Sequence, residues 1–578
     1  MLFLGIYDSS SPNFQASEIE ELKSAISRKP EDQRQVVTRP HFALVSVDFG
    51  LSGTAFFVHA QPEPKGAVSI VLGRPYLNTD SAESDADQLI AALKARDMTQ
   101  LSNARGSYCA AYYDPESMSL KLCSDKVGVF PIYIAKVGTR IYFSNALRML
   151  NNIAEIPKKL VPERLFSQIA FGYCLARDTV YAAIDRMYGG EIFEIKKAEV
   201  TTSRYWNWDD VLPGQHSEQV LQQEVYDAFI DAVRIRADSG PGEISFLSGG
   251  LDSRCIVAAL RNIGRPVWSL NFAPEGSQDY FFGRLAADAL GSHHYELGIG
   301  TEDFSSRQKT ILDSWANINQ DLVAQGVKPY RVWSGDGGSV GMGHVYLDET
   351  FIEKLRAKDI RGASEYLMKF GKLGVPVRAF QSDIKHSARL IPLEKMCEEI
   401  QGFSTQDPAK AGLLFFLMND QRHHLATYFE NLDLYKFEVV LPFFDSRLLE
   451  LIVAAPIDDF LLHVFYNKWL NKFGPAITTV PWQAYPGHVA CPLPIEGYGK
   501  LRNQWSDDWF EANQRKRKRL DEIQTWRTML NNQAFPAEIL SIRTLRLAYW
   551  LTRLKIRDYG YILDAAKKVS ILAGAGDR

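Results

Sequence analysis

The residues best suited to chemistry are a run of serines and glycines that ends in an aspartate and a serine, Ser248-Gly249-Gly250-Leu251-Asp252-Ser253. The stretch 245–247 before it and the apolar positions within 256–260 after it predict a short buried strand, a glycine turn and the start of a helix. Glycines let the backbone approach an anion, while hydroxyls and a helix N-terminus supply hydrogen-bond donors. The carboxylate of Asp252 favours a divalent cation between it and bound phosphates. The alternative is an ordinary strand-to-helix turn with two glycines.

A second candidate segment, residues 332–344, holds five glycines within nine residues, together with the acid Asp336. Glycine in an ordered element costs roughly 0.5 to 1 kcal/mol relative to Ala, so packing alone is a poor reason for so many. Close approach of the backbone to a ligand is the favoured interpretation, and a flexible surface loop is the alternative.

The elements around these segments alternate between helix and strand. Helical periodicity covers 220–236, strand patterns cover 267–272 and 292–297, and a helical pattern lies between those two strands. This alternation predicts a parallel, doubly wound sheet with ligands at the carboxyl ends of its strands. Asp279, after the second strand, is either a site acid or a helix N-cap. We expect helices over 351–450, where the polar cluster 419–424 is interpreted as solvated rather than as a site.

Residues 1 to about 200 show short strand patterns, at 41–47, 67–72 and 141–143, separated by turn residues. The tail from about 500 is expected to be helical, with a basic run at 515–519 that is typical of a solvated helix face.

The composition of the chain is ordinary, with 578 residues, a net charge of −4 and 23% charged residues. The length predicts two to four domains, and the charge offers no global argument for nucleic acid or membrane partners. Six cysteines without C-x-x-C spacing argue against a zinc site or a disulfide framework. No apolar stretch of about 20 residues exists, so we expect a cytoplasmic protein.

The string SGGLDS resembles the pyrophosphate loop of ATP pyrophosphatases, most closely in the asparagine synthetase family. It lacks the lysine of a Walker loop. Segment 332–344 resembles that family's second site loop. Segments that resemble, in order, the second half of its glutaminase domain are 106–114, 124–133, 143–145, 189–193 and 204–206. The resemblance implies an α/β/β/α sandwich of antiparallel sheets over 1–206, an ATP pyrophosphatase domain over 217–495 and a helical extension over 496–578.

The resemblance also implies ATP and Mg²⁺ as cofactors, with Asp252 as a metal ligand and Asp252 and Asp336 as catalytic residues. The ATP-binding residues that it implies are Leu247, Ser248, Gly249, Gly250, Leu251, Asp252, Ser253, Leu270, Ser334 and Gly335.

Five departures from the family pattern bear on function. Leu2 stands where the glutaminase needs a cysteine, so we expect no glutamine hydrolysis. Ser339 and Val340 replace an aspartate, which is a metal ligand, and a glutamate, and Val440 replaces an arginine. The family's catalytic lysine is missing from 481–488. Its candidate replacements are His488, Lys468 and Lys500. Segment 482–488 is expected to be an ordered loop, either with a binding role or for plain packing.

The function implied is an ATP-dependent ligase that adenylates a carboxylate and forms an amide with ammonia or an amine. One alternative is a macrolactam-forming ligase of the lasso-peptide cyclase or β-lactam synthetase type. Another is a degenerate nucleotide-binding scaffold. The expected partners are small-molecule or peptide carboxylate and amine substrates, with no nucleic acid and no membrane, and the protein is a possible homodimer.

Overall fold

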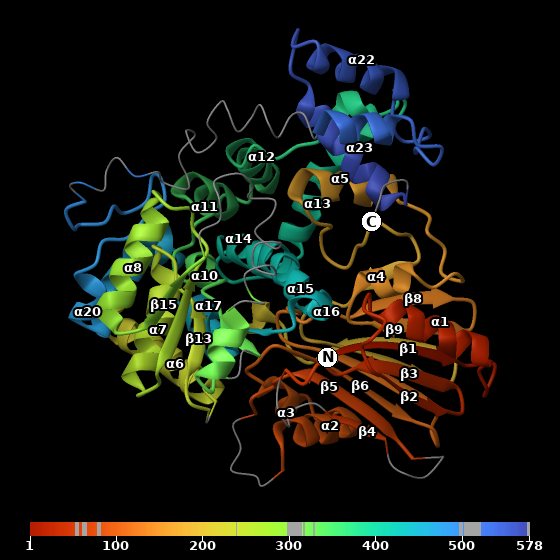
Figure 1. Ribbon diagram of the computed structural model, residues 1–578, viewed down its shortest axis with the longest axis horizontal. Coiled ribbons are helices and arrows are strands. Elements are labelled where there is room, and N and C mark those ends of the chain that lie inside the picture. The colour runs from red at the N-terminus through yellow and green to blue at the C-terminus, as the bar shows by residue number, and fades with distance from the viewer. Residues whose placement is uncertain are drawn as a thin grey trace. The chain divides into compact units, whose positions relative to one another are not determined.

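A computed structural model describes residues 1–51, 57–60, 66–77, 83–214, 216–238, 240–297, 315, 318–327, 330–495, 497, 501 and 522–574 (Figure 1). The chain forms two compact units. The first comprises Met1–Ile153, Met187–Glu349 and Phe416–Trp509, and the second comprises Ala154–Arg186, Thr350–Phe415 and Phe510–Arg578. The expected domain boundaries at 206, 217 and 495 remain predictions.

Two antiparallel sheets form the N-terminal half of the first unit (Figure 1). One sheet contains, in spatial order, β8 (Tyr133–Val137), β9 (Arg140–Ser144), β1 (Leu2–Asp8), β3 (Phe42–Val47) and β2 (Arg34–Arg39). The other contains β12 (Glu199–Arg204), β11 (Glu191–Lys196), β7 (Ser119–Ser124), β6 (Tyr108–Asp114), β5 (Val68–Gly73) and β4 (Phe57–Ala60). The strands predicted at 41–47, 67–72 and 141–143 are confirmed.

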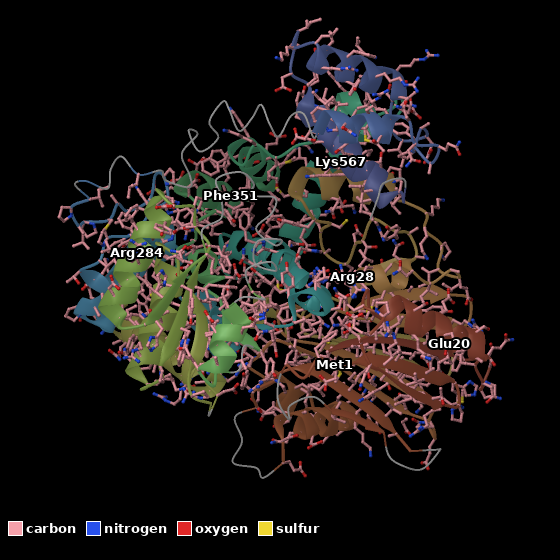
Figure 2. All side chains as sticks on the ribbon, viewed as in Figure 1. Met1, Glu20, Arg28, Arg284, Phe351 and Lys567 are labelled. Carbon is pink, nitrogen blue, oxygen red and sulfur yellow. The ribbon has the colours of Figure 1, made fainter. Side chains whose placement is uncertain are left out.

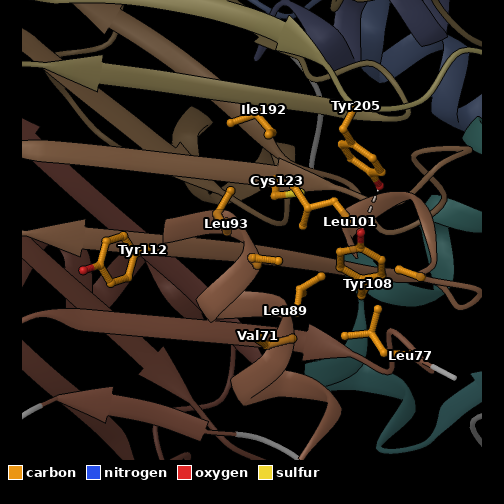
Figure 3. Packing of buried hydrophobic residues seen from close by; sticks show 13 residues of the cluster. Val71, Leu77, Leu89, Leu93, Leu101, Tyr108, Tyr112, Cys123, Ile192 and Tyr205 are labelled. Atoms are coloured by element: carbon orange, nitrogen blue, oxygen red, sulfur yellow. Dashed lines mark hydrogen bonds between the residues drawn. The ribbon is translucent and has the colours of Figure 1, made fainter. Parts of the chain in front are cut away.

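These sheets face each other and carry helices on their outer sides. The ring of Tyr113 on β6 stacks on Phe42 of β3 with 4.5 Å between centroids, and it meets Tyr7 of β1 edge-on at 6.0 Å. Helix α1 (Ala16–Ile26) covers the first sheet, and α2 (Asp85–Ala95) covers the second. Leu89 and Leu93 of α2 pack in a buried cluster with Tyr108, which faces the opposite side of β6 from Tyr113 (Figure 3). The α/β/β/α sandwich is therefore confirmed.

A parallel sheet organises the C-terminal half of the first unit. Its strands, in spatial order, are β15 (His293–Glu296), β14 (Val267–Asn271), β13 (Glu243–Phe246), β16 (Arg331–Trp333) and β17 (Glu438–Val440). Helices α6 (Glu218–Arg236), α7 (Leu251–Asn262) and α8 (Gln278–Leu290) alternate with the first strands, which confirms the doubly wound fold. The helical prediction over 351–450 missed β17, because a strand of three residues, one glutamate and two valines, is too short to show a period.

Short helices complete the first unit. They are α3 (Met98–Ser102), α4 (Leu147–Asn151), α10 (Gly338–Gly341), α15 (Arg422–Glu430), α16 (Leu432–Tyr435), α17 (Ser446–Ala454), α18 (Ile457–Phe460), α19 (Val464–Trp469) and α20 (Pro475–Thr478).

Buried charges join the sandwich to the parallel-sheet half. The carboxylate of Asp445 is fully buried and accepts hydrogen bonds from Arg105 Nε (3.2 Å) and Arg236 Nη1 (2.7 Å). Arg28, labelled in Figure 2, donates from Nη2 to Oδ1 of Asp433 (2.6 Å). Because these carboxylates would be costly to bury without partners, the pairs fix how the two halves meet.

The second unit is helical. Its helices are α5 (Pro162–Phe171), α11 (Glu349–Arg356), α12 (Ile360–Phe370), α13 (Lys385–Gln401), α14 (Lys410–Phe415), α22 (Ile542–Arg553) and α23 (Gly560–Leu572). Helix α13 packs on α5 and α12, and α22 packs on α23. The expected helical tail is confirmed over α22 and α23, whereas the basic run 515–519 lies outside the described residues. No helix within the described part of the chain has the length and hydropathy needed to cross a bilayer.

Candidate nucleotide site

The serine–glycine run forms the tight connection predicted between β13 and α7. The backbone N–H of Ser248 donates to Oγ of Ser253 (3.0 Å), and that of Gly250 donates to Oγ of Ser248 (3.2 Å). These two hydroxyls therefore hold the turn in shape before any ligand is bound. The strand, the turn and the helix start are confirmed, and the assignment of residues 247–253 to ATP binding stays a prediction.

Leu270 lies next to this turn because β14 pairs with β13. The N–H of Leu247 donates to the carbonyl of Leu270 (2.9 Å), which extends the ladder by one residue beyond the paired strands. Both side chains are buried. These two apolar residues, both expected to bind ATP, thus lie on adjacent chain segments at the carboxyl end of the sheet.

The second glycine-rich segment meets the first at the same edge of the sheet. It follows β16, which pairs with β13 at Trp333 and Ser245. A Cβ on Gly335 would lie 2.8 Å from Cβ of Asp252, and one on Gly338 would lie 2.5 Å from its Oδ1. Side chains would clash at both positions, so the glycines let this loop pack directly on the first turn of α7. A flexible surface loop is therefore excluded for these residues.

The carboxylate of Asp252 lies between the two loops and is only partly exposed. Its Oδ1 accepts a hydrogen bond from the hydroxyl of Tyr466 (2.6 Å), and its Oδ2 accepts one from Ser339 (2.7 Å). Burial raises the pKa of Asp252 from 3.8 to about 6, the two hydroxyls oppose that rise, and the charge of Asp336 adds to it. Two neighbouring acids in a desolvated place favour a bound cation.

The side chains around Asp252 offer a few oxygen ligands that suit Mg²⁺. Mg²⁺ in nucleotide sites commonly takes one or two carboxylates and completes its shell with phosphates and waters. Asp252 and Asp336 supply two carboxylates, and Ser339 supplies a hydroxyl where the family pattern has an acid. Among the described residues no group of three or more His, Cys, Asp or Glu is arranged to hold a metal by itself.

Asp336 is held by its own loop. Its Oδ2 accepts a hydrogen bond from the hydroxyl of Ser334 (2.6 Å), and its Oδ1 lies 3.7 Å from Nε2 of His424. The imidazole of His424 is 58% exposed. The interpretation of the cluster 419–424 as solvated is wrong, because Asn419, Gln421 and Arg422 are buried. His424 is the exposed member of the cluster and lies beside the site.

Asp279 supports the first loop and does not cap its helix. Ser277 is the N-cap of α8 and accepts from the N–H of Tyr280, which contradicts the N-cap interpretation of Asp279. Oδ1 of Asp279 instead accepts from the N–H of Gly249 (2.8 Å). The acid after the second strand thus fixes the backbone of the candidate phosphate loop.

Arg254 is a site residue that sequence reasoning missed. Its guanidinium is fully buried and donates to the carbonyls of Gly250 (2.9 Å), Gly249 (3.2 Å), Val480 (2.8 Å) and Pro481 (2.9 Å). Burial lowers its pKa to about 10, which leaves it charged at neutral pH. A charged side chain within the otherwise apolar stretch 254–260 was the available signal.

The segment 482–488 is an ordered loop packed on the first loop, as expected. The N–H of Gln483 donates to the carbonyl of Gly249 (3.1 Å). Tyr485 contacts Ser339 through a hydrogen bond, and burial together with the charge of Asp252 raises the pKa of Tyr485. The binding role of this loop stays a prediction.

Two of the three candidate replacements for the lysine lie in the part of the chain that the structure describes, and neither supplies a free cation to this loop. Nδ1 of His488 lies 2.8 Å from Nδ1 of His463, and burial lowers the pKa of both rings, that of His463 to about 3. Both imidazoles are therefore neutral at pH 7. Nζ of Lys468 pairs with Glu218 (2.6 Å), and Lys500 lies outside the described residues.

Comparisons with known proteins find separate matches for the antiparallel sandwich and for the parallel-sheet half of the first unit. A family model described as glutamine amidotransferase domain matches residues 77–206, and one described as asparagine synthase matches residues 224–318. The chain is 25% identical over 240 residues to asparagine synthetase [glutamine-hydrolyzing] 1 of Bacillus subtilis, covering 40% of this chain and 37% of that protein. It is 24% identical over 286 residues to putative asparagine synthetase [glutamine-hydrolyzing] 2 of Methanocaldococcus jannaschii, covering 46% and 54%. The chain therefore matches about half or less of the length of these relatives.

Solved structures that match weakly include glutamine phosphoribosylpyrophosphate amidotransferase from B. subtilis, at 12% identity and a TM-score of 0.23 over 46% of this chain and 65% of that one. Another is NMN synthetase from Francisella tularensis, at 15% identity and a TM-score of 0.19 over 37% and 97%. The stronger similarity is in the sequence. One segment of the chain matches a glutamine amidotransferase domain, the next matches asparagine synthase, and the chain is similar to asparagine synthetases over less than half of its length.

Proposed function

We propose that the protein is an ATP- and Mg²⁺-dependent ligase that adenylates a carboxylate and joins it to ammonia or an amine, with release of AMP and pyrophosphate. The observation that carries this proposal is the position of Asp252. Its carboxylate lies where two glycine-rich loops meet at the carboxyl ends of β13 and β16. Ligands of doubly wound folds bind at this edge.

Different residues of the chain would bind the phosphates and the cation. The turn 248–250 and the N-terminus of α7 present hydrogen-bond donors to the phosphates. Asp252, with Asp336 beside it, would hold the cation, and Mg²⁺ would supply positive charge that offsets the charge of the phosphates. The acceptor carboxylate attacks the α-phosphorus, the bond to the β-phosphate oxygen breaks, and pyrophosphate leaves. The amine then attacks the acyl carbon, loses a proton and displaces AMP.

Arg254 supports this assignment as a positioning residue. It binds two carbonyls of the phosphate turn and two of the segment 480–481. It therefore couples the turn to the loop where the family's lysine is missing.

We further propose that the N-terminal domain retains the sandwich without glutamine hydrolysis. Leu2 is fully buried in β1. Burial raises the pKa of Cys109 well above its ordinary value, so its thiol is not available as a nucleophile. The amine would then come from solution or from a second substrate rather than from glutamine.

A nucleotide-binding scaffold is the competing function, and one observation favours it. Ser339 binds Asp252 where the family pattern has a metal-binding acid, and a neutral hydroxyl is a weaker ligand for a hard cation. Such a protein would bind ATP without cleaving it.

Pyrophosphate release from ATP and Mg²⁺ separates these functions. Purified protein is supplied with aspartate plus ammonium, then with glutamine, then with pooled carboxylates and peptides. A ligase releases pyrophosphate with at least one acceptor, and Asp252→Asn abolishes the release. Binding of ATP with no release under any condition would support the scaffold. Release that needs glutamine and yields glutamate would contradict the loss of glutaminase activity.

A further inference from the structure

Helix α22 of the second unit is apolar on two opposite sides, only one of which is covered. Leu545, Ala548 and Tyr549 are buried on one side, and the helix packs on α23 (Figure 1). On the other side Leu547, Trp550 and Leu554 are 61%, 50% and 61% exposed. Their spacing of three and four residues places them in one stripe along the helix. An exposed row of large apolar side chains marks an interaction surface.

Positive charge surrounds this stripe. The exposed basic residues within 541–561 are Arg543, Arg546, Arg553, Lys555 and Arg557. Asp558 is the one acid in that range, so its local charge is five minus one, or +4, in a chain whose net charge is −4. The guanidinium of Arg553 lies over the ring of Trp550, 5.0 Å from its centroid. Lys567, labelled in Figure 2, adds a further cation on the adjacent α23.

A bilayer matches this surface better than a protein does. The stripe is one helix wide and its side chains lie along one exposed side of that helix, so a flat partner can receive every side chain at once. A basic helix with Trp and Leu on its exposed face lies in the plane of a membrane interface, its apolar side chains about 5 to 10 Å deep. Arginines reach lipid phosphates while their aliphatic stems stay on the apolar side. A second copy of α22 would bring like charges together.

We propose that α22 docks this stripe on the surface of an anionic lipid bilayer. With twelve residues the helix is too short to cross a bilayer, which takes about 20. The contact is therefore peripheral: Trp550 and Leu554 enter the interface, and the arginines supply attraction to anionic headgroups. The low net charge of the whole chain gave no reason to expect this partner, but the local charge of α22 does.

The test is co-sedimentation of the full chain with vesicles. We expect binding to vesicles of phosphatidylcholine with about one-third phosphatidylserine, and little binding to phosphatidylcholine alone. Substitution Arg546→Gln with Arg553→Gln should weaken binding by about fivefold for each residue, and added salt should weaken it further. The pair Trp550→Asp and Leu554→Asp should weaken it at least about tenfold. Phe370→Asp is the matched control, because Phe370 is 63% exposed on α12 outside the stripe.

Circular dichroism confirms that each variant is folded before it is compared. Absence of binding to anionic vesicles would overturn the proposal. So would binding that the Trp550 and Leu554 substitutions leave unchanged. A concentration-dependent dimer in sedimentation velocity, lost in the same variant without lipid, would assign the stripe to a second copy instead. None of these readouts uses ATP, so the result stands apart from the proposed ligase activity.

Discussion

Replacing Tyr466 by Phe removes the hydroxyl that donates to Oδ1 of Asp252 at 2.6 Å and keeps the ring that packs against His463 and Trp469. A hydrogen bond to an ionised group contributes about 1.5 to 3 kcal/mol. Lost from the charged form alone, this free energy corresponds to about one to two pKa units. Because the pKa of Asp252 is already about 6, we expect a value of about 7 to 8 in Tyr466→Phe.

This shift is visible in the pH dependence of nucleotide binding. Since the cation needs an ionised Asp252, Mg²⁺-dependent ATP binding should strengthen as pH rises through about 6 in the wild type. In Tyr466→Phe the same rise should occur about one to two pH units higher. Raising the Mg²⁺ concentration should move both transitions to lower pH, because the cation binds only the carboxylate. Isothermal titration calorimetry across the pH range measures this without a known acceptor.

Tyr226→Phe is the matched control. Tyr226 lies on α6, and among the described residues its hydroxyl accepts one long hydrogen bond, from Asn262 (3.4 Å). It should leave the transition where the wild type has it. A folded Tyr466→Phe protein with the same transition as the wild type would refute the electrostatic account of Asp252.

Three further predictions concern stability and the loop. Because the folded-state pKa of Asp252 lies above its unfolded value of 3.8, stability is lost as pH rises from about 4 through 6. Asp252→Asn should therefore raise the unfolding free energy at pH 8 by about 1 to 3 kcal/mol, seen as a higher unfolding temperature in calorimetry, with no difference near pH 4. An Asp252→Asn protein that is no more stable at pH 8 would contradict the raised pKa. Arg254→Met removes the hydrogen-bond donor of four backbone carbonyls, so it should lower the unfolding free energy by about 3 kcal/mol or more and weaken ATP binding. Arg254→Lys should have intermediate effects. Unchanged ATP affinity in both variants would contradict a positioning role for Arg254. Asp445→Ala leaves Arg105 and Arg236 buried without their shared carboxylate and should cost about 3 to 5 kcal/mol by calorimetry, whereas loss of the exposed pair in Glu20→Ala should cost under about 1 kcal/mol; equal effects would contradict this account.

Local pattern was enough to predict the strand, turn and helix at 243–262, since glycines, a following apolar run and a helix start all lie within one short segment. The parallel sheet could also be predicted, because the alternation of strand and helix is visible in the local sequence pattern. Strand β17 could not, because its three residues gain their pairing with β16 from distant sequence.

The contacts that shape the site could not be predicted from local pattern. Tyr466 meets Asp252 across 214 positions, and no periodicity relates them. Asp279 was placed after the correct strand, but its choice between capping α8 and binding Gly249 depends on how α8 packs beside the turn. Arg254 lies next to the SGGLDS string, yet its partners at 480 and 481 arrive from another segment.

The identity of the nucleotide products tests the central claim most directly. With ATP, Mg²⁺ and the acceptor pool, a ligase of the kind proposed converts ATP into AMP and pyrophosphate in equal amounts, as resolved by ion-exchange chromatography. Asp252→Asn should form neither product above background. Formation of ADP and inorganic phosphate by the wild type, or AMP formation that persists in Asp252→Asn, would contradict the account.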